Sequence, residues 1–327
     1  MKISVIILLI IICLVLFYNF SWADRVGKVI EENFLLNNTG SFSLNNVAGE
    51  IVVHSWEKEE VRMVATKSIT SWGTSDPEEL LDKIEIEITS KPENLKISTH
   101  FPQFSWIRNA RVDYEVWIPR EVNVRLSSVS GTIQMKSHLN RVYANTVSGK
   151  IKLDDINGNV EVQTTSGDTI INDVRGDFIW SSTSGELDML HLVGDLDLHT
   201  VSGDISGSEV NGKIKANSVS GGISLRNSQG NLAYLRTTSG NIRAELEAIS
   251  SDASGMSLST ISGDIILYLP ADISFDLDIN TVSGDINTRF EVLIDSSDER
   301  KLLGTVSGGG INVNINTVSG DISLRKL

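Results

Sequence analysis

Carboxylates recur directly after glycine in this sequence, and they are its most regular candidates for chemistry. Two series repeat every eighteen residues: Asp168, Glu186 and Asp204 form one, and Asp177 and Asp195 form the other. If the repeats stack, like charges repel, and a bound cation would relieve the repulsion. However, the Gly-Gly-x-Gly-x-Asp motif of calcium-binding β-rolls is missing, and Lys150 and Lys213 interrupt the two series. We therefore favour solvated edge charges, which oppose association of sheets, over a calcium site.

Catalytic and metal-binding motifs have little support in the sequence. The histidines His54, His100, His138, His191 and His199 make no His-Glu-x-x-His pair, and Cys13 is the single cysteine. A Gly-x-Ser-x-Gly elbow and a phosphate-binding glycine loop are both missing. The Ser-Gly pairs recur, whereas a catalytic serine occurs once. We predict no catalytic residue, cofactor or metal. The alternatives are a polysaccharide-processing enzyme with paired carboxylates and a Ca²⁺-dependent β-roll.

Two tryptophans are candidates for ligand binding. Trp72 and Trp106 fall in loop-like stretches, Ser71-Trp72-Gly73 and Phe104-Ser105-Trp106, where an exposed ring could bind a sugar or a lipid. The simpler interpretation, which we favour, places them with Trp56 and Trp117 in a widened core that caps the repeat region.

A repeat of nine residues would position these groups. Glycine recurs at every ninth residue from Gly149 to Gly230, and serine precedes every second glycine, so the full repeat has eighteen residues. Apolar or small residues alternate with polar ones over residues 147–153, as in a half-buried strand. Because nine is odd, the alternation breaks once per unit. The breaks fall at polar pairs such as Asp154-Asp155 and Gln163-Thr164, which we predict to be the corners.

Stacking explains the repeat, because a nine-residue unit cannot bury an apolar face alone. The sequence predicts an all-β fold, a single-stranded parallel β-helix with eighteen-residue coils made of two nine-residue units. An antiparallel meander is the alternative. Serine precedes glycine only in every second unit, so like units should stack on like, which favours the helix.

Four segments follow from these patterns. Residues 1–23 resemble a cleavable export signal, with Lys2, an apolar run and Ser21-Trp22-Ala23 before a cleavage site at Asp24; an uncleaved anchor is the alternative, although the run is short for a span. Residues 24–127 form an irregular β cap, with strands at 84–88, 95–99 and 112–118 and one short helix starting at Asp76-Pro77. Residues 128–245 carry the regular coils, and residues 246–327 carry less regular ones.

The net charge of −14 limits the partners. Nucleic acids and anionic lipid surfaces both require a basic footprint, which this chain lacks. We therefore expect no nucleic acid, and contact with a membrane only through an uncleaved N-terminal segment. The sequence leaves the oligomeric state open.

The motif Thr-Val-Ser-Gly-Asp-Ile occurs whole at 200–205, 281–286 and 317–322, and an early variant, Val-Ala-Gly-Glu-Ile, stands at 47–51. With these motifs the chain resembles the bacterial exported β-strand-repeat family labelled "putative adhesin", which is similar to the head domain of autotransporter adhesins. The resemblance implies a right-handed β-helix in the periplasm or at the cell surface, and it carries over no catalytic residue. We expect a non-enzymatic scaffold that binds an envelope, glycan or protein partner.

Overall fold

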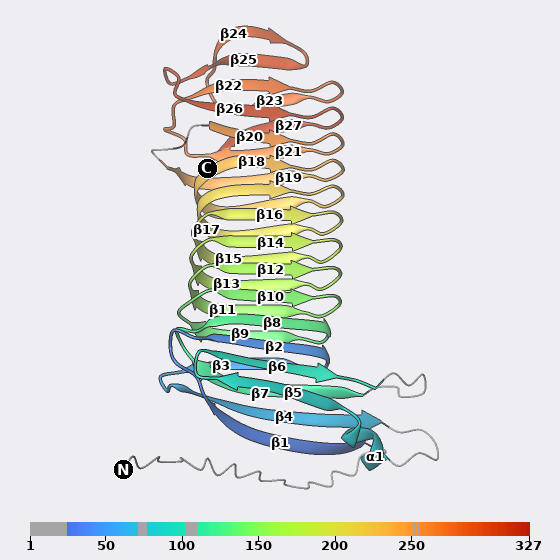
Figure 1. Ribbon diagram of the computed structural model, residues 1–327. Helices are drawn as coiled ribbons and strands as arrows, with labels where there is room; N and C mark the ends of the chain where they lie inside the picture. The colour runs from blue at the N-terminus through green and yellow to red at the C-terminus, as the bar shows by residue number, and fades with distance from the viewer. Residues whose placement is uncertain (1–24, 71–76, 103–109, 251–252, 254) are drawn as a thin grey trace. The chain divides into compact units, whose positions relative to one another are not determined.

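The computed structural model describes residues 25–70, 77–102, 110–250, 253 and 255–327, and these are almost entirely β-strand (Figure 1). The chain divides into two compact units, one ending at Asn123 and the other running Val124–Leu327. The predicted all-β class is therefore confirmed.

The first unit mixes parallel and antiparallel pairs. β4 pairs antiparallel with β1 and β7, and β3 lies parallel to β7; β6 pairs parallel with β2 and antiparallel with β5. The strands predicted at 84–88, 95–99 and 112–118 and the short helix are all present. The elements are β1 (Arg25–Leu35), β2 (Ser41–Ala48), β3 (Ile51–Trp56), β4 (Glu60–Thr70), α1 (Pro77–Asp82), β5 (Glu85–Lys91), β6 (Asn94–His100) and β7 (Arg111–Pro119).

Trp56 and Trp117 do not lie in the core of this unit, so that prediction is wrong for them. Both are half-buried. The Trp117 ring stacks on His54, with the ring centroids 5.1 Å apart, and the Arg62 guanidinium lies 4.9 Å from its centroid. Aliphatic side chains with Phe42 and Tyr114 fill the core instead.

The second unit is a stack of coils in which strands pair in parallel with the next coil (Figure 1). Its strands up to the last regular coil are β8 (Asn123–Ser130), β9 (Ile133–His138), β10 (Val142–Thr146), β11 (Ile151–Asn157), β12 (Val160–Thr164), β13 (Thr169–Arg175), β14 (Phe178–Ser182), β15 (Leu187–Val193), β16 (Leu196–Thr200), β17 (Ile205–Asn217), β18 (Ile223–Arg236) and β19 (Ile242–Ile249). In the regular part the pairing step is eighteen, as in Val142↔Val160 and Ile151↔Thr169. An antiparallel meander therefore does not describe these residues.

Identical inward positions stack to make the core of this unit. Ile133, Ile151, Leu187 and Ile205 lie in one buried column, as the alternation predicts. Thr169 replaces an aliphatic residue in that column. Its hydroxyl accepts a hydrogen bond from the indole N–H of the fully buried Trp180, at 3.0 Å, which satisfies the one polar group of that ring.

A tight turn at Val-Ser-Gly or Thr-Ser-Gly joins the two strands of each coil at one edge. The Gln163-Thr164 pair is not the corner that the sequence predicts. Thr164 is buried, its hydroxyl accepts a hydrogen bond from the Gly167 N–H at 2.8 Å, and the chain bends at Thr165-Ser166. The turn glycines stack so closely that a Cβ on Gly221 would lie 2.0 Å from the carbonyl oxygen of Gly203. Only glycine fits there.

The last coils do not stack in chain order. β26 pairs in parallel with both β20 and β22, and β27 pairs with both β21 and β23, so the C-terminal coil lies between two earlier ones (Figure 1). The prediction of less regular coils did not foresee this insertion. The elements are β20 (Gly255–Ser259), β21 (Ile265–Leu269), β22 (Phe275–Asn280), β23 (Ile286–Thr288), β24 (Leu293–Asp298), β25 (Lys301–Val306), β26 (Ile311–Asn316) and β27 (Ile322–Lys326).

Candidate functional site

A column of residues with left-handed backbone runs along one corner of the coils. Six of them stand eighteen positions apart, with φ between 47° and 59°: Ser137, Asp155, Asp173, His191, Glu209 and Asn227. We call these the corner row. The strand pairing omits Asp155 and Asp173 and resumes in the same register after them, and the inward-outward alternation of side chains breaks at both positions. Asp and Asn tolerate this backbone best, because their short polar side chains bond locally. The corner predicted at Asp154-Asp155 is confirmed.

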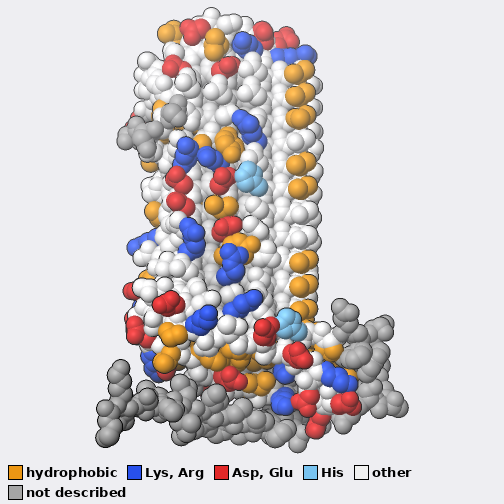
Figure 2. All heavy atoms as spheres, viewed as in Figure 1, with side chains coloured by type: hydrophobic (Ala, Val, Ile, Leu, Met, Phe, Trp, Pro, Cys, Tyr) orange, Lys and Arg blue, Asp and Glu red, His pale blue; other side chains and the backbone are white. Residues whose placement is uncertain are grey.

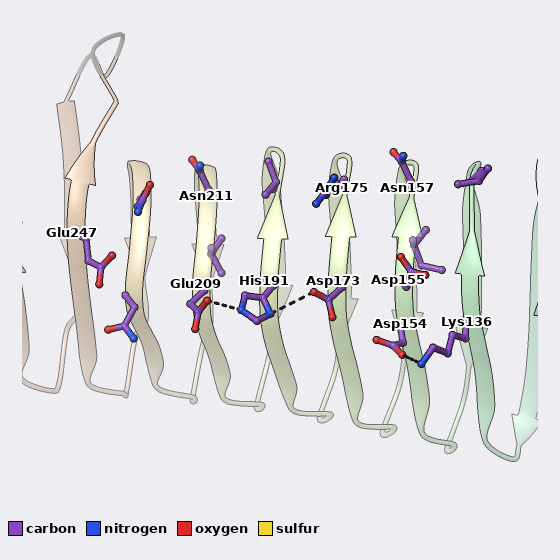
Figure 3. A pocket seen from close by; sticks show the side chains of 16 residues that line it. Lys136, Asp154, Asp155, Asn157, Asp173, Arg175, His191, Glu209, Asn211 and Glu247 are labelled. Carbon is purple, nitrogen blue, oxygen red and sulfur yellow. Dashed lines mark ion pairs between the residues drawn. The ribbon is translucent and has the colours of Figure 1, made fainter.

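The corner row from Asp155 to Asn227 lines a groove of about 1020 Å³ that extends along the coils from Lys136 to Glu247. A second row stands two residues further along each coil, and Figure 3 shows its members Asn157, Arg175 and Asn211 in one line across the strands. Leu139 and Val193 add the apolar surface of that row. The groove is therefore a long, mainly polar surface built from equivalent positions of successive coils.

Side chains of the corner row bond to one another between coils. His191 lies between two carboxylates, with its Nδ1 3.4 Å from Asp173 and its Nε2 2.5 Å from Glu209 (Figure 3). The Ser137 hydroxyl donates to Asp155 at 2.7 Å. All three members of the Asp173–His191–Glu209 group are exposed. The imidazole is thus fixed in orientation and still open to a ligand.

The groove carries an excess of negative charge. Its carboxylates are Asp154, Asp155, Asp173, Glu209 and Glu247, and its permanent cations are Lys136 and Arg175. Lys136 is paired with Asp154 at 3.0 Å, and this hydrogen bond raises the pKa of the Lys136 ammonium. A ligand of this surface would be neutral or cationic, because an anion would be repelled.

The sequence matches the Toastrack DUF4097 family over residues 40–325. This chain is a member of the Toastrack DUF4097 family. The resemblance noted in the Val-Ser-Gly motifs is thereby confirmed. No curated protein shows significant sequence similarity to this Toastrack chain.

Three solved structures are similar to this Toastrack chain over most of their length. A "putative cell adhesion protein" from Clostridium sporogenes has 14% identity and a TM-score of 0.25, covering 91% of this chain and 99% of its own. A "putative lipid binding protein" from Parabacteroides distasonis has 14% identity and a TM-score of 0.39, covering 91% of this chain and 96% of its own. A "putative adhesin" from Bacteroides fragilis has 11% identity and a TM-score of 0.34, covering 92% of this chain and 97% of its own. Likenesses this distant say nothing about what this chain binds.

The carboxylate series of the Toastrack chain stack as predicted, and backbone amides compensate their charge. Asp168 and Asp177 each accept a hydrogen bond from the N–H one coil later, that of Glu186 at 3.4 Å and that of Asp195 at 3.2 Å. In the described ranges, no group of three or more His, Cys, Asp or Glu side chains has an arrangement that could hold a metal ion, and this includes the Asp173–His191–Glu209 group.

The two predicted ligand-binding residues, Trp72 and Trp106, lie outside the described residues. The sequence predicted the corner at Asp154-Asp155 but not the turn beyond Thr164, and it did not predict the groove. The available signal was the polar pair with an acidic second member, at Asp154-Asp155, Asn172-Asp173 and Ser208-Glu209. That pattern does not indicate that the breaks lie on the grooved side of the coils. In the part of the chain that the structure describes, no helix has the length and hydropathy of a membrane span.

Proposed function

We propose that this Toastrack protein is an exported, non-enzymatic scaffold that holds a neutral or cationic glycan along the groove. The observation that carries the proposal is the corner row, which presents Asp, His, Glu and Asn side chains at one register in successive coils. A polymer with repeating hydroxyl and amino groups can engage such a row at several coils at once. Each contact is weak at an exposed site, and several together give useful affinity.

The chemistry of the groove favours binding over catalysis. The imidazole of His191 has a carboxylate at each ring nitrogen, and the one hydroxyl of the row, that of Ser137 three coils away, bonds to Asp155. His191 therefore has no nucleophile to activate within this described cluster. The acidic residues of the groove would suit the alternative of a glycoside-cleaving enzyme, but no Trp, Tyr or Phe ring lines the described groove to hold the sugar.

The detailed architecture and the cellular location are part of the same proposal. We infer a right-handed β-helix with eighteen residues per coil, supported by the pairing step and by the handedness of parallel crossovers in general. Residues 1–23 would direct export to the periplasm or cell surface and be removed before Asp24. The intact mass of the protein recovered outside the cytoplasm tests this cleavage.

The binding test uses residues 24–327 and a panel of neutral, amino-sugar and acidic glycans in titration calorimetry. We expect saturable binding of neutral or amino-sugar polymers, weakened at least tenfold by Glu209→Gln or Asp173→Asn. Glu186→Gln and Asp188→Asn make the same charge changes outside the groove and should leave binding unchanged. Equal loss of binding in the groove variants and in the control variants, or no binding of any glycan, would contradict the proposal that the groove is the binding site.

Two further experiments distinguish the groove from the aromatic patch and the scaffold from an enzyme. Trp72→Ala and Trp106→Ala test the aromatic patch predicted from the sequence; loss of binding in these variants alone would move the site to the first unit. Release of reducing ends from a bound glycan would show turnover, and would replace the scaffold by an enzyme.

A further inference from the structure

The turn edge of the second unit carries a long uncharged stripe. Ten turns at this edge carry a β-branched residue directly before their Ser-Gly pair, and both that residue and the following serine are exposed. Figure 2 shows the hydrophobic members as a row along one edge. In spatial order the stripe begins with Val129, Val147, Thr165, Thr183, Val201 and Val219. It continues with Thr238, Ile261, Val318 and Val282.

The turn itself does not require these side chains. The buried hydroxyl of Thr200 and the glycine at 203 make the turn, through a hydrogen bond of 3.1 Å. The Val201 side chain between them is 47% exposed, and Val282 is 59% exposed. Turn positions of this kind favour small polar residues over β-branched ones. An exposed apolar row of this length points to a partner.

The two flanks of the stripe differ in charge. The column after the glycines carries six carboxylates, those of Asp168, Glu186, Asp204, Asp264, Asp321 and Asp285. The column on the other flank, one residue before the buried hydroxyl, has none. It includes Gln163, His199, Asn217 and Arg236.

We propose that the stripe pairs two copies of this chain side by side with their stacks parallel. A second copy has the same spacing between coils by construction, so every coil of one stripe meets a coil of the other. A two-fold axis along the stack places the acidic flank of each copy against the carboxylate-free flank of its partner. The antiparallel arrangement would face acid with acid, which is unfavourable.

The stripe is narrow, and this sets the strength of the contact. Ten coils at about 4.8 Å each give a length of roughly 45 Å, and two side-chain columns give a width of about 10 Å. Such an edge buries roughly 900 Å² in total, below the range of stable dimers. We expect a weak, concentration-dependent dimer in solution.

Disulfide cross-linking distinguishes the arrangements. The chain from Asp24 onward contains every described residue and no cysteine, so Ser130→Cys, Ser202→Cys and Ser283→Cys introduce single thiols along the stripe. We expect each variant to cross-link with itself on mild oxidation, several-fold faster than the control Asn211→Cys in the groove. If only Ser202→Cys links to itself while Ser130→Cys links to Ser283→Cys, the stacks are antiparallel and the charge argument is wrong.

A charge placed in the stripe gives the second test. Val201→Lys with Val219→Lys should remove the cross-linking of Ser202→Cys and the concentration dependence of sedimentation. Val201→Thr with Val219→Thr is the matched control, because threonine already occupies three coils of the stripe. Circular dichroism confirms that each variant is folded. Cross-linking at the rate of the Asn211→Cys control in all three serine variants would overturn the proposal.

Discussion

The carboxylate of Asp204 accepts a hydrogen bond from the backbone N–H of Gly222, 2.7 Å away and eighteen residues later. The same contact recurs along the turn edge, from Asp321 to Asp264 at 2.8 Å and from Asp285 to Asp321 at 2.9 Å. The aspartate that follows the turn glycine thus joins neighbouring coils at these positions. The acidic column is stabilised because the carboxylates of Asp204, Asp264 and Asp321 each face an amide dipole.

Asp204→Ala should lower the free energy of unfolding by about 1 kcal/mol, because the Gly222 N–H loses its acceptor. Asp204→Asn is the control and should cost less, since Asn159 and Asn241 make the same contact elsewhere in the stack. Urea unfolding measures both variants. An unfolding midpoint that rises with Ca²⁺ and falls with chelator would instead favour a cation on this edge.

Neighbouring glycines give a second prediction. Gly221→Ala would place a Cβ 2.0 Å from the carbonyl oxygen of Gly203, so the backbone must shift, and we expect a loss of about 3 kcal/mol or more. Gly222→Ala is its matched control, because the nearest atom to its Cβ lies 3.4 Å away. It should change stability by less than about 0.5 kcal/mol. Equal effects of the two substitutions would contradict the close stacking of turn glycines.

Thr169→Val should destabilise the second unit although its shape hardly changes. It leaves the indole N–H of the buried Trp180 without an acceptor, which costs about 1–3 kcal/mol. The double variant Thr169→Val with Trp180→Phe removes both polar groups. If the hydrogen bond stabilises the fold, Thr169→Val should lower the free energy of unfolding less in the Trp180→Phe background than in the unchanged protein. Equal costs in both backgrounds would mean that the contact contributes nothing.

Tyr114 predicts an alkaline loss of stability. Burial raises its pKa from 10.0 to about 12, while its hydrogen bond to Thr99 partly opposes the shift. Between pH 10 and pH 12 the unfolded chain therefore releases a proton that the folded chain keeps, so stability falls as pH rises. The full effect is about 2.7 kcal/mol. Tyr114→Phe should show a shallower fall over this range in urea unfolding at stepped pH, and an unchanged slope would contradict the assignment.

The inserted C-terminal coil predicts a large effect of a short truncation. Removal of residues 311–327 takes away β26 and β27, including the buried Val313, Ile315, Ile322 and Leu324. Each buried side chain contributes about 1.5–3 kcal/mol, and β22 also loses its parallel partner. We expect β22 to β25 to become sensitive to protease and the thermal transition to broaden. Removal of Leu327 alone, which loses one backbone hydrogen bond at 2.9 Å, should leave both unchanged.

Much of the second unit could be predicted because its information is local. Alternation with a period of two predicted that Ile151 and Leu153 face inward, and the nine-residue step of glycine predicted the length of each coil. The candidate site was harder to predict. Asp155 and Thr164 both stand at breaks in the alternation, yet Asp155 forms a left-handed corner and Thr164 turns inward to bond Gly167.

By itself, the sequence determined the eighteen-residue period, the residues that face inward and the family of this protein. Each of these depends on spacing along the chain, which a sequence displays directly. The tertiary structure alone decided that Asp173, His191 and Glu209 share one groove, and that Ile322 pairs with both Ile265 and Ile286. The physical reason is that these relationships depend on which coil packs on which, and repeating units with the same pattern can stack in more than one order.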